Sequence, residues 1–153
     1  MDQKPYFPMF TDLSEKKVTV VGAGIIAKRR VRTLIQFTDH VTVIAPEVNR
    51  ELLDLEKEGR IRILRKHFEQ ADIFGADVVI AATSDAKTNN DVYANCKCLG
   101  ITVNVCSDRT KCDFFFPGVV QKENVVVGVT ASGRDHKLAR KVTKKIRELI
   151  ETL

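Results

Sequence analysis

The chain has 153 residues, a net charge of +5 and an apolar fraction of 44%, values typical of one soluble globular domain, or of one domain plus a short appendage. This composition excludes a disordered chain, and no apolar run reaches the roughly 20 residues that a membrane-spanning helix needs. The N-terminal residues lack the apolar core of a secretory signal, so we expect a cytoplasmic protein.

The four cysteines are too few and too unevenly spaced for a disulfide scaffold or a common zinc site. They stand at positions 96, 98, 106 and 112. Small disulfide-built domains are denser in cysteine, and structural zinc sites use closely paired ligands. We therefore expect reduced thiols and no bound metal; the alternative is a metal cluster with an uncommon ligand spacing.

Strand-like and helix-like segments alternate along residues 18–105. Strands are predicted at 18–22, 41–44, 60–64, 77–82 and 101–105, because these segments are short and rich in apolar and β-branched residues. Helices are predicted after residue 24, with Ile26, Ala27, Val31, Leu34 and Ile35 on one face, and at 47–58 and 86–99, with a short helical connection at 67–74. This alternation predicts an α/β fold, a Rossmann-type doubly wound parallel sheet with helices on both faces.

The last third of the chain has a different pattern. Two apolar segments, at 114–117 and 124–130, have no helix between them, and one long helix is predicted at about 135–152. Its apolar stripe consists of Leu138, Val142, Ile146, Leu149 and Leu153. We expect a Rossmann domain at 1–111 and a small C-terminal α/β segment at 112–153, which forms a twofold dimer because so much apolar surface needs covering.

A glycine-rich motif lies between the first predicted strand and the first predicted helix, from Gly22 to Ala27. In this setting Gly22 permits a tight turn, Gly24 lets the backbone approach a pyrophosphate, and Ala27 allows close helix packing. The helix start at Ile25 and Ile26 offers unpaired N–H groups to the phosphates. The motif predicts an NAD(P) site; the alternative is a tight turn without a ligand.

The choice between NAD and NADP is open at this stage. The second strand is followed by Pro46 and Glu47, and Glu47 has two interpretations: binding the ribose hydroxyls, or stabilising the first turn of the next helix. NAD is the expected cofactor. NADP is not excluded, because Lys28, Arg29, Arg30 and Arg32 either accommodate a 2′-phosphate or form a solvated helix face.

Thr83 follows the fourth predicted strand. The carboxyl ends of the first and fourth strands flank the ligand crevice of a doubly wound sheet, so Thr83 is a candidate cofactor contact. The alternative is a helix N-cap, shared with Ser84 and Asp85.

Several landmarks then occur together in one order. They are Tyr6–Phe10, Val20–Gly24 with Ala27 and Arg29-Arg30, Val43–Pro46, Ala81–Asp85, Asn104-Val105, Cys112–Pro117, and Gly133 with Leu138-Ala-Arg140. Over roughly residues 5–150 the chain resembles the precorrin-2 dehydrogenase family, the dehydrogenase/ferrochelatase part of siroheme synthases. The resemblance implies NAD-dependent oxidation of precorrin-2 to sirohydrochlorin by a homodimer, with Fe²⁺ insertion in some members.

The resemblance also implies an acid a few residues after the Asn of the fifth strand. Ser107 occupies the family position in this chain, and the nearest acid is Asp108, one residue later. Asp108 is therefore the candidate catalytic residue, which would accept a proton during oxidation or metal insertion. The alternative is a turn residue that binds the local backbone.

The tetrapyrrole substrate that the resemblance implies is rich in carboxylates, and the last predicted helix is basic. Residues 134–153 carry seven basic and three acidic side chains, which accounts for most of the net charge. Such a patch attracts anions; the candidate substrate-binding residues are Ser132, His136, Lys137 and Arg140. The alternatives are a solubilising helix face, a weaker nucleic-acid role without interleaved aromatic residues, and, for the whole chain, a nucleotide-sensing regulatory module without catalysis.

Overall fold

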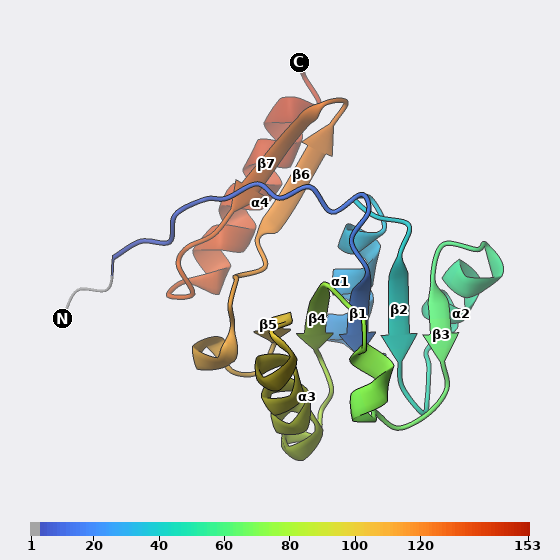
Figure 1. Ribbon diagram of the computed structural model, residues 1–153. Helices are drawn as coiled ribbons and strands as arrows, with labels where there is room; N and C mark the ends of the chain where they lie inside the picture. The colour runs from blue at the N-terminus through green and yellow to red at the C-terminus, as the bar shows by residue number, and fades with distance from the viewer. Residues whose placement is uncertain (1–3) are drawn as a thin grey trace. The chain divides into compact units, whose positions relative to one another are not determined.

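A computed structural model describes residues 4–153, which divide into two compact units (Figure 1). One unit is Asp12–Phe115. The other is Phe116–Leu153 together with the N-terminal segment that ends at Thr11. This boundary differs from the one expected between residues 111 and 112, and the N-terminal segment groups with the second unit. Residues 1–3 of the expected domain 1–111 lie outside the described residues.

The unit Asp12–Phe115 is built on a five-stranded sheet in the order β3-β2-β1-β4-β5. The strands are β1 (Val18–Val21), β2 (Val41–Ile44), β3 (Arg62–Leu64), β4 (Val78–Ala81) and β5 (Thr102–Val105), and every pairing is parallel. The strand order reverses direction at β1, which is the arrangement of a doubly wound sheet. The predicted α/β Rossmann-type fold is confirmed.

Both faces of this sheet are covered. The helices are α1 (Ile25–Leu34), α2 (Arg50–Lys57) and α3 (Ala86–Leu99), with short 3₁₀ turns η1 (Gln70–Ile73) and η2 (Arg109–Lys111). Right-handed crossovers run in opposite directions from the centre of the sheet, so α1 and α2 lie on one face and α3 on the other (Figure 1). The inner strands β1, β2 and β4 are consequently buried on both sides, which explains their nearly continuous apolar sequences.

The buried face of α1 is narrower than predicted. Ala27, Val31 and Leu34 are buried, at the i, i+4 and i+7 spacing that faces a sheet, whereas Ile26 is 49% exposed. The prediction that Ile26 packs inward is therefore wrong. Ile26 lies in the first turn of the helix, one position before Ala27, which takes the place facing the sheet.

The second unit contains an antiparallel hairpin, β6 (Gly118–Lys122) and β7 (Val125–Val129), and the helix α4 (His136–Ile150). The helix packs closely on β6: a Cβ added at Gly118 would lie 2.5 Å from the hydroxyl of Thr143. No helix within residues 4–153 combines the length and apolar character that crossing a membrane requires.

The face that α4 presents to the hairpin differs from the predicted stripe. Ile150 is buried, and Ile146 and Thr143 are partly buried, whereas Leu138 and Leu149 are 51% and 62% exposed. The predicted stripe is thus rotated, because Gly118 opens a close approach at Thr143 that hydrophobic periodicity alone does not reveal. Part of the apolar surface of α4 is left uncovered within its own unit.

Candidate nucleotide-binding site

Gly22 is required by the fold of the loop that follows β1. Its φ angle is +116°, and a Cβ added there would lie 2.4 Å from the carbonyl oxygen of Ala82. The Gly22 N–H donates to the Ile44 carbonyl at 2.9 Å. The loop is therefore held against the ends of both β2 and β4, at the point where the strand order reverses.

Gly24 shows the opposite behaviour, since nothing in the fold requires a glycine there. Its backbone is extended (φ −79°, ψ −166°), which any residue adopts, and a Cβ would meet no atom within 4 Å. It is the N-cap of α1, and no side chain caps the helix at this point. The space that a Cβ would fill is therefore free for a ligand that approaches the backbone at the positive end of the helix.

The residues at this point fit the phosphates of a dinucleotide. Ile25 and Ile26 form the first turn of α1 with large exposed fractions, and no acidic residue lies in that turn. A shallow cavity of about 260 Å³ adjoins the loop, lined by Ala23, Gly24, Ile25, Lys28, Asn49, Arg50 and Glu51. An anion seated there would meet the helix N–H groups, and the carboxylate that lines the cavity, Glu51, is paired with Lys28 and Arg32.

Asn49 fixes the glycine loop to the start of α2, a role that the sequence analysis missed. Its side-chain amide donates to the Ala23 carbonyl at 2.7 Å, and its Oδ1 accepts the N–H of Leu52 at 3.1 Å. Asn49 is thus the N-cap of α2. An asparagine just before an amphipathic segment is a recognised helix-start signal and would have placed this boundary.

The position of Asn49 at the start of α2 excludes one of the two interpretations of Glu47. Since α2 begins at Arg50, Glu47 lies ahead of the helix and not in its first turn, so that interpretation is wrong. Pro46 and Glu47 are exposed after β2, at the carboxyl edge of the sheet. Ribose binding by these two residues stays a prediction.

The basic side chains on α1 have defined partners. Glu51 accepts from the Lys28 ammonium at 2.7 Å and pairs with Arg32 at 3.0 Å. The hydrogen bond from Lys28 lowers the pKa of the Glu51 carboxyl below its usual value. Two of the four cations considered for a 2′-phosphate are therefore engaged in an α1–α2 ion-pair network.

Thr83 lies at the carboxyl end of β4, beside the glycine loop, in a dense polar network. Its hydroxyl lies 2.7 Å from Oδ1 of Asn89 and accepts the Asp85 N–H at 3.2 Å. The N-cap of α3 is Asp85, which accepts the Thr88 N–H at 2.9 Å; the hydrogen bond from the Thr88 side chain lowers the Asp85 pKa. Thr83 supports the helix start without being its cap, and cofactor contact by Thr83 stays a prediction.

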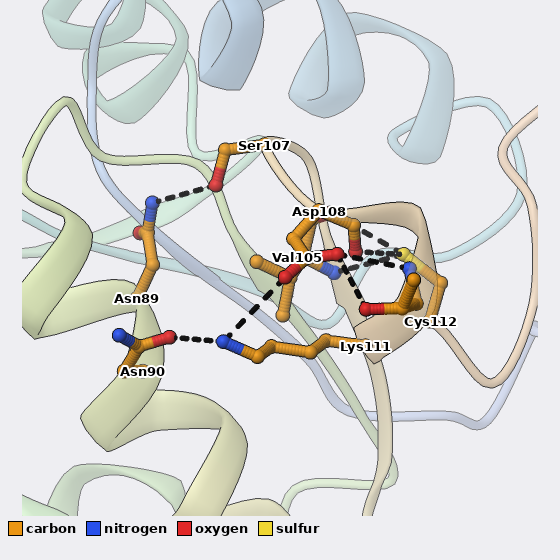
Figure 2. A network of polar contacts seen from close by, with 8 residues as sticks. Asn89, Asn90, Val105, Ser107, Asp108, Lys111 and Cys112 are labelled. Carbon is orange, nitrogen blue, oxygen red and sulfur yellow. Dashed lines mark hydrogen bonds and ion pairs between the residues drawn. The ribbon is translucent and has the colours of Figure 1, made fainter.

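Asp108 begins the short η2 turn after β5 (Figure 2). Its carboxylate accepts the Thr110 N–H at 3.0 Å and the Thr110 hydroxyl at 2.6 Å, and it pairs with Lys111 at 3.5 Å. The Thr110 side-chain bond is the largest of the causes that lower the Asp108 pKa. The carboxylate is partly exposed and ionised at neutral pH, and it makes the local turn contacts that the alternative interpretation expects.

Ser107 and Cys112 frame the same turn. Ser107 is exposed, and its hydroxyl accepts from the amide of Asn89 at 3.3 Å (Figure 2). The Cys112 sulfur accepts the Val105 N–H at 3.3 Å, and its single S–H lies within hydrogen-bond distance of the carbonyls of Val105 and Asp108, at 3.3 and 3.4 Å. Burial raises the pKa of the Cys112 thiol, so it is a packing and hydrogen-bonding group and not a thiolate.

The other cysteines are also free thiols, and burial raises the pKa of Cys96 to about 11. Across residues 4–153, no three His, Cys, Asp or Glu side chains come together in a way that would hold a metal ion. Cys96, Cys106 and Cys112, whose pKa burial raises, are therefore unreactive core or turn groups, whereas Cys98 is exposed on α3.

The four candidate substrate residues lie in the second unit, at and before the start of α4. Ser132 accepts the N–H of Tyr6 at 3.1 Å, which ties the N-terminal segment to this unit. His136, Lys137 and Arg140 are exposed on the first turns of α4, whose N-cap is Asp135. The structure brings these residues together along one helix start; substrate binding by them stays a prediction.

The chain is similar to proteins named for siroheme biosynthesis. The chain is 39% identical over 144 residues to a probable multifunctional siroheme biosynthesis protein HemA of Ruminiclostridium josui, which covers 94% of this chain and 28% of that protein. It is 37% identical over 145 residues to siroheme synthase 1 of Cronobacter sakazakii, covering 95% of this chain and 31% of that protein. The chain thus spans less than a third of these curated relatives.

A solved structure titled SirC, precorrin-2 dehydrogenase, has the same fold, with a TM-score of 0.84 at 24% identity over 94% of this chain and 70% of that one. These matches confirm the resemblance that the sequence landmarks indicated. A family described as putative NAD(P)-binding matches residues 9–118, which include the glycine loop and all five strands of the sheet. Because this match covers more than half of the chain, the protein belongs to the putative NAD(P)-binding family.

Proposed function

We propose that the chain oxidises precorrin-2 to sirohydrochlorin with NAD⁺ as the hydride acceptor. The observation that carries this proposal is Gly24, a glycine that the fold does not require and that leaves room for a pyrophosphate at the start of α1. The substrate class is supported by relatives named for siroheme synthesis, which match 94% or more of the chain. A precorrin-2 dehydrogenase with the same fold supports the reaction type.

The chain's own contribution is mainly binding and orientation. The backbone N–H groups of Ile25 and Ile26 would hold the pyrophosphate, and Asn49 keeps their loop in place. The chemistry that NAD⁺ contributes when bound is acceptance of the hydride. Holding two reactants in a reactive geometry provides several kcal/mol of the barrier reduction without a protein base.

The test is an anaerobic assay of the purified chain with precorrin-2 and, separately, NAD⁺ or NADP⁺. We expect NADH formation coupled to the appearance of sirohydrochlorin. Nucleotide binding without turnover would instead identify a nucleotide-sensing module, the alternative function. The ratio of rates with the two nucleotides decides the cofactor. The engagement of Lys28 and Arg32 by Glu51 favours NAD⁺, since it occupies two of the cations that a 2′-phosphate would need.

Substrate binding is proposed for Ser132, His136, Lys137 and Arg140. Lys137 and Arg140 are exposed cations on the most basic segment of the chain. Precorrin-2 carries many carboxylates, so an exposed basic helix raises its local concentration. The proposal is limited to a small tetrapyrrole ligand, without a nucleic acid or membrane partner.

A homodimer is proposed because α4 and its hairpin leave apolar side chains uncovered. Leu138, Leu149 and Val125 are each more than half exposed. We expect light scattering at micromolar concentration to give twice the chain mass of 17.2 kDa. The double variant Leu138→Lys/Leu149→Lys is expected to be monomeric, because charge on this surface opposes its burial.

Glu148→Lys is the matched control for the dimer, since it adds positive charge to α4 without removing apolar surface. It is expected to keep the mass of the wild type. A wild-type mass of one chain, or a double variant that keeps the dimer mass, would contradict the proposal.

We also propose that the protein works in the cytoplasm. Cys96, Cys98, Cys106 and Cys112 are free thiols, the state that reducing compartments maintain. Cell fractionation is expected to place the chain with cytoplasmic marker enzymes.

Asp108 is proposed as the proton acceptor, with a larger share in Fe²⁺ insertion than in oxidation. Insertion of Fe²⁺, a substrate here, requires removal of pyrrole protons, and a general base typically contributes about 10²–10⁴-fold in rate. The lowered Asp108 pKa keeps the carboxylate in its ionised, proton-accepting form at neutral pH, and it also makes this carboxylate a weaker base than an unpaired one.

We expect Asp108→Asn to keep the fold and NAD⁺ affinity, because the amide oxygen still accepts from Thr110. Sirohydrochlorin formation is expected to fall, and any Fe²⁺ chelation to fall further, by about 100-fold or more. Steady-state rates of the two reactions measure this. Wild-type rates in both would leave Asp108 as the cap of η2 only.

A further inference from the structure

Asn89 is buried on the sheet-facing side of α3, an uncommon place for an asparagine. Its exposed fraction is 3%, and asparagine is a weak helix former. It is not needed to start the helix, because Asp85 caps α3. A buried polar side chain inside a helix is retained at a cost, so its hydrogen-bond partners indicate its role.

All the hydrogen-bonding groups of the Asn89 side chain have partners. Oδ1 accepts the Thr83 N–H at 3.2 Å and lies 2.7 Å from the Thr83 hydroxyl. Nδ2 donates to the Thr83 carbonyl at 3.1 Å and to the Ser107 hydroxyl at 3.3 Å. One side chain therefore holds the whole Thr83 residue and links it to the turn after β5, a link that Figure 2 shows at Ser107.

The backbone of Ala82 and Thr83 packs directly against the glycine loop. The Ala82 N–H donates to the Val21 carbonyl at 2.8 Å, and a Cβ added at Gly22 would lie 3.0 Å from the Thr83 nitrogen. These two backbones are therefore in direct contact. A shift of Thr83 away from α3 consequently changes the shape of the crevice between the ends of β1 and β4, where a doubly wound sheet binds its ligand.

We propose that Asn89 is a positioning residue of the nucleotide site. It fixes the Thr83 segment against the glycine loop. Through its hydrogen bond to Ser107, it also holds this segment at a fixed position relative to the turn after β5. The inference deepens the proposed function and rests on its nucleotide site. Asn89 acts through Thr83 and Ser107, and a purely structural asparagine would affect stability alone.

The test compares Asn89→Leu with Asn95→Leu in the full chain. Leucine has the same branched shape at Cγ as asparagine, although it is larger, and it makes none of the four hydrogen-bond contacts of Asn89, so the Thr83 segment is no longer held by this side chain. Asn95 is the matched control, since it lies on the same helix and its amide donates to the Asp91 carbonyl of that helix at 2.8 Å. Calorimetry well below the unfolding temperature is expected to show about tenfold weaker NAD⁺ binding for Asn89→Leu and wild-type affinity for Asn95→Leu.

Ser107 provides a second measurement that does not depend on a core substitution, because its side chain is exposed. Ser107→Ala is expected to weaken NAD⁺ binding by about threefold, and Ser107→Thr, which keeps a hydroxyl, to restore it. The Asn89→Leu/Ser107→Ala double variant is expected to bind NAD⁺ no more weakly than Asn89→Leu, because Asn89→Leu already removes the hydrogen bond between Asn89 and Ser107.

The outcomes separate this inference from the proposed function. A wild-type chain that binds neither NAD⁺ nor NADP⁺ overturns both. A wild-type chain that binds NAD⁺, with unchanged affinity in Asn89→Leu or in Ser107→Ala, overturns the positioning role alone. If Asn89→Leu does not fold, the pair Ser107→Ala and Ser107→Thr decides, and equal affinities in the two overturn the inference.

Discussion

Gly24→Asp is expected to abolish measurable NAD⁺ binding while leaving the fold intact. The new carboxylate would occupy the space at the start of α1 that is open above Gly24. Two like charges about 4 Å apart repel by about 4 kcal/mol at an effective dielectric constant of about 20. A pyrophosphate next to this carboxylate therefore loses at least about 100-fold in affinity.

The stability of Gly24→Asp is not expected to fall together with its NAD⁺ affinity. Gly24 is the N-cap of α1 and has a backbone conformation open to any residue, and aspartate is among the preferred N-cap residues. The unfolding temperature of Gly24→Asp should therefore equal or slightly exceed that of the wild type. Calorimetric titration and thermal unfolding of the same sample provide both readouts.

Gly24→Ala separates volume from charge. A single methyl group is expected to weaken NAD⁺ binding less than the carboxylate does, with the same unfolding temperature as the wild type, because no protein atom lies within 4 Å of the new carbon. Unchanged NAD⁺ affinity in folded Gly24→Asp would contradict the placement of the pyrophosphate at this loop.

The sheet was predictable from sequence because its strands are buried on both faces. Val18–Val21 and Val78–Ala81 are short runs of β-branched and small residues with no polar face, and this pattern has few alternatives once it alternates with amphipathic segments. The glycine loop was predictable for a related reason: its meaning depends on neighbours in sequence, a strand before it and a helix after it.

The polar connections between loops were not predictable in the same way. Asn89 lies near the start of the helical segment Ala86–Leu99, and sequence alone suggests a solvated position for an asparagine there. Its partners Thr83 and Ser107 are 6 and 18 residues away, and only the pairing of β4 with β5 brings them to one edge. Asn49 joins two loops 26 residues apart in the same manner.

The rotated face of α4 has a similar cause. Leu138 and Leu149 follow the helical period, so periodicity assigns them to the core. The missing information is the shape of the partner, because Gly118 on β6 admits Thr143 more closely than any larger residue would allow. Hydrophobic patterns thus indicate that a helix has an apolar face, but the packing surface decides which residues meet it.

Gly22→Ala is expected to destabilise the unit Asp12–Phe115 strongly, in contrast to Gly24→Ala two residues later. Its Cβ would lie 2.4 Å from the Ala82 oxygen and 2.7 Å from the Ala82 carbon, and these are backbone atoms held by the pairing of β1 with β4. The φ angle of +116° adds strain for any residue with a Cβ. Together these effects cost about 3 kcal/mol, which lowers the unfolding temperature by about 10 °C for a chain of this size.

Gly59→Ala is the matched control for Gly22→Ala. Gly59 also has a positive φ angle, of +72°, but a Cβ there meets no atom within 4 Å, so only the backbone strain of about 1 kcal/mol remains. Thermal unfolding of the two variants separates the steric from the conformational cost. Equal unfolding temperatures would contradict the close approach of Gly22 to Ala82. Gly22→Ala is also expected to weaken NAD⁺ binding, because the new methyl group pushes the end of β4 away from the glycine loop.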